Sequence, residues 1–122
     1  MSSNIHSLFW GGRMKFTVNN NRWALQFASP NSEELRRSDN VYTLGVTDNN
    51  TKTVTIAYGM SDYMTNKVLC HELVHVYSFE NNCNIDIQTE EIIADFMSLY
   101  GRDIIYLADD ILNNVMEKKW NA

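Results

Sequence analysis

Residues 71 to 75 have the sequence His-Glu-Leu-Val-His, which places two histidines four residues apart. In a helix, His71 and His75 would lie one turn apart on one face, where both imidazoles can bind a single metal ion. Glu72 would lie close to a water on that ion and can act as its general base. Because this register is rare by chance, the spacing predicts a zinc site with Glu72 as the catalytic residue.

A catalytic zinc ion needs a third protein ligand and one open position. After a polar break at 81–84, the chain resumes a helical pattern that carries Glu90, Glu91 and Asp95. Glu91 and Asp95 are one turn apart, so we expect Glu91 to be the third ligand and Asp95 to accept the spare ring N–H of a ligand histidine. Glu90 is the rival ligand, although it points about 100° away from Glu91. The alternative for either glutamate is a favourable charge in the first turn of a helix.

The combination of His71-Glu-Leu-Val-His75 with Glu91-x-x-x-Asp95 resembles the pattern of gluzincins, the thermolysin-like metallopeptidases. The resemblance implies that His71, His75 and Glu91 hold zinc, that Glu72 is the base and that Asp95 orients a histidine. Residues 41 to 106 are also similar to ImmA/IrrE-type metallo-endopeptidases and related small phage-encoded zinc peptidases. The helix of that type usually carries Glu-Ala-Asn/Asp close together, whereas Asp95 lies a full turn beyond Glu91, which favours the broader gluzincin resemblance. Phage or mobile-element functions and a peptide or protein substrate are implied.

The first half of the chain is expected to form the sheet that supports this site. Segments 14–18 and 22–28 alternate around an asparagine turn, which predicts a hairpin. Segments 41–46 and 53–58 flank Asp48-Asn49-Asn50 and predict a second hairpin. Segment 53–58 is either an edge strand above the metal, able to pair with an extended substrate, or an interior strand.

The second half is expected to be helical. One helix should run from Ser61 or Asp62 to about Glu80, and a longer one should begin near Thr89. Apolar residues recur through the second helix at the spacing of a buried face, and Gly101 is a point where it can kink or divide. These elements predict a single α+β domain over residues 1–122. Its small, mainly antiparallel sheet should pack on an active-site helix and a long C-terminal helix.

Composition limits the classes of partner. The 122-residue chain is 44% hydrophobic, carries a net charge of −5 and shows no basic cluster, which argues against nucleic acid as a partner. No apolar run is long enough for a transmembrane span, and the first residues do not resemble a secretory signal, so we expect a cytoplasmic protein without a membrane partner. Cys70 and Cys83 are expected to be free thiols, with Cys70 facing away from the metal.

The leading hypothesis is a zinc metallopeptidase in which a zinc-bound water attacks the scissile carbonyl and Glu72 transfers its proton to the leaving amine. The alternatives are a catalytically silent, zinc-stabilised interaction module on the same fold and a coincidental motif without metal. Transition-state stabilisation usually needs a hydrogen-bond donor beside the metal. The sequence offers six candidates without selecting among them: Tyr58, Tyr63, Tyr77, Tyr100, Tyr106 and His6.

Overall fold

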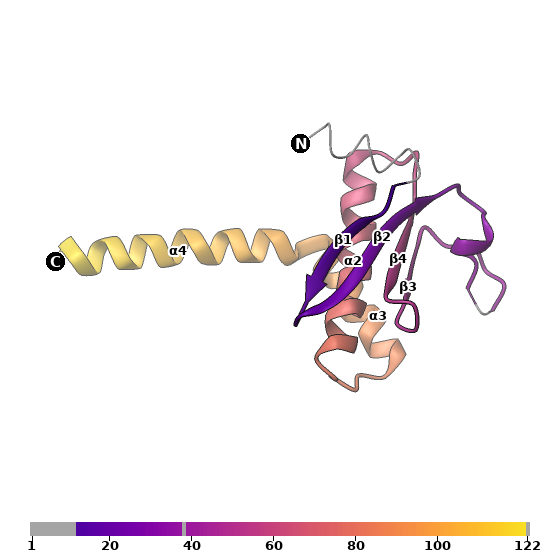
Figure 1. The fold of residues 1–122 in the computed structure, drawn as a ribbon. Helices are drawn as coiled ribbons and strands as arrows, with labels where there is room; N and C mark the ends of the chain where they lie inside the picture. Colours follow the sequence, from indigo (N-terminus) through magenta and orange to yellow (C-terminus); the bar gives the residue numbers. More distant parts are fainter. Residues whose placement is uncertain (1–11, 38, 122) are drawn as a thin grey trace.

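The computed structural model describes residues 12–37 and 39–121, and it is an α+β structure (Figure 1). Four strands form one sheet in the order β1-β2-β4-β3, in which β2 and β4 are parallel and the other two pairs are antiparallel. Helix α2 packs along this sheet, and α3 folds back beside α2. The predicted fold class, with its mainly antiparallel sheet, is confirmed.

The first hairpin joins β1 (Met14–Val18) to β2 (Asn21–Ala28). Asn19 and Asn20 both have positive φ, at 51° and 66°, which is the backbone geometry of the tight turns that match the twist of a hairpin. Asparagine tolerates this region better than most residues. The asparagine run in the sequence therefore marks the turn correctly.

The second hairpin joins β3 (Gly45–Asp48) to β4 (Thr53–Ala57). The first of these strands starts at residue 45 rather than at the expected residue 41. Every residue of β4 is buried, because β4 lies between β2 and β3 and is covered by α2. Of the two alternatives for segment 53–58, the structure therefore shows the interior strand, and β3 lies at an edge of the sheet.

Helix α2 (Asp62–Glu80) begins after Ser61, whose side chain accepts a hydrogen bond from the backbone N–H of Met64. Val76 on this helix is fully buried against the sheet, in a cluster that includes Trp23, Val54 and Ile56. The same face of α2 carries Glu72 and His75, which are also buried. The packing of Val76 into the core therefore fixes the orientation of the α2 face that carries Glu72 and His75.

Helix α3 (Ile87–Phe96) is capped by Asp86 and starts two residues before the expected Thr89. One π-helical turn, η2 (Met97–Gly101), joins it to α4 (Arg102–Asn121), so the division occurs where Gly101 predicted it. Helix α4 then projects away from the body of the molecule (Figure 1). No helix in the described part of the chain is long and apolar enough to cross a membrane.

The expectation that the apolar face of the last helices is buried is wrong for this structure. From residue 92 onward, Ala94 and Gly101 are the buried positions among those with described side chains. The large apolar side chains are exposed instead: Ile92, Ile93, Phe96, Met97, Leu99, Tyr100, Ile104, Ile105, Ile111, Leu112 and Val115. Periodicity predicted which side chains share a face, but no element in the described part of the chain covers that face along α4.

Candidate metal centre

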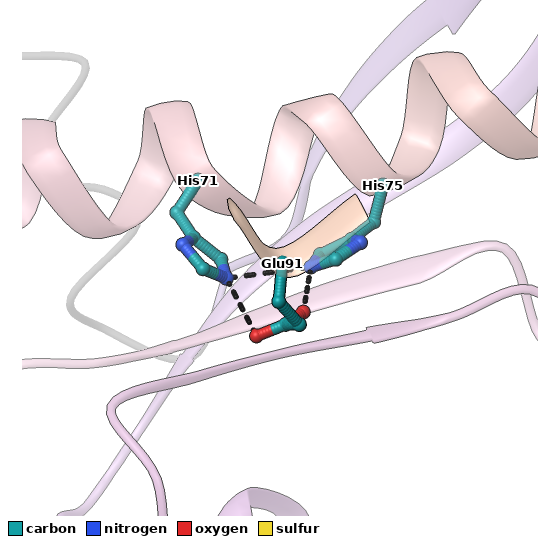
Figure 2. Close-up of side chains that lie close together, drawn as sticks. All are labelled: His71, His75 and Glu91. Carbon is teal, nitrogen blue, oxygen red and sulfur yellow. Dashed lines mark hydrogen bonds and ion pairs between the residues drawn. The ribbon is translucent and has the colours of Figure 1, made fainter. Parts of the chain in front are cut away.

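Two helices and one short connection bring the candidate ligands together. His71 and His75 lie one turn apart on α2, and Glu91 projects toward them from α3 (Figure 2). The connection reverses the chain through Asn82 and Asn84, both of which have positive φ. One nitrogen from each histidine and one carboxylate oxygen of Glu91 lie within 4.8 Å of one another.

Two of the three distances among these atoms match those of a tetrahedral zinc ion. Zinc bound at 2.0–2.1 Å separates neighbouring ligand atoms by about 3.3 Å. The two Nε2 atoms of His71 and His75 are 3.3 Å apart, and Nε2 of His71 lies 3.4 Å from Oε2 of Glu91. Nε2 of His75 is closer, at 2.6 Å from Oε1 of Glu91, which is the length of a hydrogen bond. A metal ion would replace the proton in that contact.

The outer nitrogens of both histidines are held by carboxylates. Nδ1 of His71 lies 3.0 Å from Oδ1 of Asp95, and Nδ1 of His75 lies 2.6 Å from Oε1 of Glu90. An ionised carboxylate only accepts hydrogen bonds, so each Nδ1 is the donor. In a neutral imidazole of this tautomer, the lone pair is on Nε2 and faces the other histidine and Glu91. The two carboxylates thus fix both ring orientations, with each Nε2 directed toward Glu91.

Glu90 has a role that the sequence did not reveal. Its carboxylate is buried and accepts a second hydrogen bond, from Oγ of Ser78 at 2.6 Å. It therefore lies behind the His75 ring, at Nδ1 rather than at the Nε2 that faces the candidate metal position, which disfavours Glu90 as the rival ligand. It is also more than an exposed first-turn charge, because it ties α3 to two residues of α2. Knowledge of which side of α3 packs on α2 was needed to find this role.

Glu72 lies between the helix and the edge strand β3. The hydroxyl of Thr47 donates a hydrogen bond to Oε1 of Glu72 at 2.7 Å. Burial raises the pKa of Glu72, while the Thr47 hydrogen bond and the neighbouring histidines oppose the rise. The strand approaches this closely because residue 45 is glycine: a Cβ there would lie 3.0 Å from Cγ of Glu72. Glu72 is therefore positioned by both α2 and β3.

A cleft of about 220 Å³ opens beside His71 and Glu72. Its walls come from the segment that leads into β3, from the first half of α2 and from the end of α3. The lining residues are Thr43, Leu44, Gly45, Met64, Lys67, Val68, His71, Glu72, Asp95 and Ser98. None of the five candidate tyrosines is among these residues, and His6 lies outside the described part of the chain. Lys67 is a hydrogen-bond donor in this lining that we had not predicted.

The two cysteines are free thiols, as predicted. Cys70 lines a different hollow, on the side of α2 away from this cleft, together with Cys83.

Comparison of the chain with protein-family models, with curated protein sequences and with solved structures gives no match.

Proposed function

We propose that this protein is a zinc-dependent metallopeptidase whose ligands are His71, His75 and Glu91. The observation that carries the proposal is the convergence of two imidazole Nε2 atoms and one carboxylate at the separations of a tetrahedral site, with each imidazole oriented from behind by a carboxylate. Structural zinc sites usually have four protein ligands, whereas catalytic sites keep one position open. Three ligands, with Glu91 partly exposed, support a catalytic site.

Zinc and Glu72 have different roles in the proposed reaction. Zinc, when bound, supplies a Lewis acid that polarises water and a substrate carbonyl. Glu72 is one residue from a ligand and faces the same cleft, so we assign it the proton transfer from the attacking water to the leaving amine. Because burial raises its pKa, its protonated form is less acidic than an exposed glutamic acid, which suits a group that must both take and return a proton.

The edge strand β3 provides a position for an extended peptide. Among residues 12–37 and 39–121, no strand pairs with its outer side, and Gly45 at its start lines the cleft. A peptide that added to this edge would make main-chain hydrogen bonds and run past His71 and Glu72. The cleft is small, so we propose that the substrate is an extended segment of a peptide or protein. The resemblance to phage-encoded peptidases supports a cytoplasmic regulatory protein as the substrate.

A catalytically silent zinc module is the second candidate. The observation that favours it is the way Glu91 and Glu90 each tie α3 to a histidine of α2, because a metal there would also join the two helices. The two candidates differ at Glu72, which a purely structural site does not need. A Glu72→Gln variant that keeps its zinc and loses hydrolysis supports the peptidase. Absence of hydrolysis in the wild type, across a library of extended peptides, supports the module.

The first experiment is zinc content per chain by native mass spectrometry after reconstitution under reducing conditions. We expect one zinc in the wild type and in Glu34→Ala, an exposed glutamate distant in sequence from the site, and loss of zinc in Glu91→Ala. Wild-type protein without zinc would contradict both candidate functions. Zinc that survives Glu91→Ala with unchanged affinity would show that the third ligand is another residue, with Glu90 the next to replace.

A further inference from the structure

Lys67 places a positive charge in the cleft beside the candidate metal centre. It lies on α2 four residues before His71, and its half-buried side chain lines the cleft. Within the part of the chain that the structure describes, Lys67 has no ion-pair or hydrogen-bond partner. A charge that is partly removed from water gains from pairing with an opposite charge. Its ammonium group is therefore available to an anion that enters the cleft.

The other polar side chains of the cleft, apart from the candidate ligand, already have partners. The hydroxyls of Thr43 and Ser98 donate to backbone carbonyl oxygens, at 3.1 Å and 2.8 Å. The carboxylates of Glu72 and Asp95 each accept a hydrogen bond from a neighbouring side chain. Among residues 12–37 and 39–121, Lys67 is thus the lining side chain whose donors are all unused.

The remaining walls of the cleft favour a charge pair at Lys67. Leu44, Met64 and Val68 are apolar and line the same space. Ion pairs at an open surface contribute little, because water screens them. Apolar walls replace part of that water and lower the effective dielectric, which strengthens the attraction between charges. A carboxylate in this cleft would therefore pair more strongly with Lys67 than with an exposed lysine.

The place of Lys67 on α2 limits which part of a substrate it can reach. Four residues of helix rise by about 6 Å, so Lys67 lies about that far along the axis from His71. Consecutive Cα atoms of an extended peptide are about 3.8 Å apart. When the scissile carbonyl lies at the metal position beside His71, a peptide that runs toward the start of α2 brings one of its next two residues to Lys67. The ammonium group thus meets a group close to the scissile bond.

We propose that Lys67 selects substrates that carry a carboxylate beside the scissile bond, either an Asp or Glu side chain or a free C-terminus. The inference rests on the proposed metallopeptidase function and names its substrate class. The net charge of the chain is −5, so its overall field does not attract an acidic peptide, and Lys67 supplies the positive charge locally. A different role for the same group, donation to the oxyanion of the transition state, would affect every peptide equally.

Peptide binding to a chain that does not turn over measures this preference. The protein is Glu72→Gln, labelled with ¹⁵N and reconstituted with zinc, and the readout is the amide chemical shifts. The probes are acetylated six-residue alanine peptides with one Asp at each position in turn, their Asn counterparts, and the unsubstituted peptide as free acid and as amide. We expect at least one carboxylate peptide to bind about tenfold more tightly than its uncharged counterpart, the size of a charge-assisted hydrogen bond.

Three variants in the same background assign the preference to Lys67. Lys67→Met should abolish it, and Lys67→Arg should retain it because the charge remains. Lys15→Met is the control, since Lys15 is exposed on β1, at the opposite edge of the sheet from β3. Added salt should weaken the preference, because it screens a partly exposed charge pair. The Asp series identifies a side-chain carboxylate, and the comparison of acid with amide identifies a C-terminal one.

The outcomes separate this inference from the proposed function. No carboxylate preference in any pair of peptides, or a preference that survives Lys67→Met, overturns the role of Lys67. Equal losses for charged and uncharged peptides in Lys67→Met would assign the ammonium group to the oxyanion and also overturn it. Hydrolysis by the wild type is scored separately with the same peptides. A Lys67-dependent preference without hydrolysis contradicts the peptidase and leaves the carboxylate site, whereas hydrolysis without the preference contradicts the carboxylate site alone.

Discussion

Replacement of Glu90 by glutamine should weaken metal binding although Glu90 is not a proposed ligand. In the wild type, the buried carboxylate accepts hydrogen bonds from Nδ1 of His75 at 2.6 Å and from the hydroxyl of Ser78 at 2.6 Å. The glutamine has nearly the same shape and can still accept the His75 hydrogen bond through its carbonyl oxygen. The negative charge behind the imidazole is lost, and the amide N–H₂ then faces the Ser78 oxygen.

The expected size of the effect follows from these contacts. A hydrogen bond to a charged group contributes about 1.5–3 kcal/mol, and a neutral one contributes about 0.5–1.5 kcal/mol. The difference, about 1–1.5 kcal/mol, corresponds to a dissociation constant for zinc that is roughly tenfold higher. Replacement of groups that orient a ligand histidine typically costs 10–100-fold in metal affinity. Asp95→Asn should have a smaller effect, because the Asp95 side chain is 69% exposed and water screens its charge.

Competition with a chromophoric chelator measures these affinities directly. The control is Glu34→Gln, which removes the same charge from an exposed position at a distance in sequence from the site. Thermal unfolding of the metal-free proteins checks that each variant folds. If Glu90→Gln binds zinc within twofold of the Glu34→Gln control, Glu90 does not tune His75 through this hydrogen bond. If Asp95→Asn binds zinc more weakly than Glu90→Gln does, the burial of the carboxylate does not decide how strongly it supports the ligand histidine.

Three further predictions concern stability. Leu35→Ala should lower the free energy of unfolding by about 2–5 kcal/mol in urea titrations, because Leu35 is fully buried; a loss below 1 kcal/mol would contradict this. Gly45→Ala should lower it by about 1–3 kcal/mol, because the added Cβ would lie 2.7 Å from Cγ1 of Val68, and unchanged stability would show that Val68 yields without cost. Glu80→Gln should lower the melting temperature at neutral pH, because the Lys52 hydrogen bond holds the pKa of Glu80 below its usual value. Because the pKa of Glu80 is lower in the folded than in the unfolded state, its ionised carboxylate stabilises the folded state above the ordinary glutamate pKa of about 4.3. The difference in melting temperature between Glu80→Gln and the wild type should therefore shrink as the pH falls through the folded-state pKa. A difference that grows in acid would contradict the assignment.

The sequence predicted those features of the candidate site that depend on local geometry. The four-residue spacing of His71 and His75 fixes their common face wherever the segment is helical, and the same rule relates Glu91 to Asp95. The capping residue Ser61 and the asparagine runs mark boundaries by their own backbone and side-chain preferences. The helices, the first hairpin and the two shared faces, His71 with His75 and Glu91 with Asp95, therefore follow from short-range geometry.

The tertiary structure decided which surfaces meet. Glu90 and Glu91 are adjacent in the sequence, and only the packing of α3 on α2 shows that one faces the candidate metal position while the other accepts the Nδ1 hydrogen bond of His75. Strand order depends on long-range pairing, so the sequence could not place β4 inside the sheet and β3 at its edge.

The same distinction applies to the last helix. The sequence determined that α4 has an apolar face, because periodicity depends only on the helix itself. Whether that face is covered depends on what other chain segments reach it, and in this structure Ile104, Ile111 and Val115 on that face are exposed. Local spacing thus determined which side chains share a face, and only the tertiary structure decided what each face contacts, since contacts between distant segments depend on the path of the whole chain.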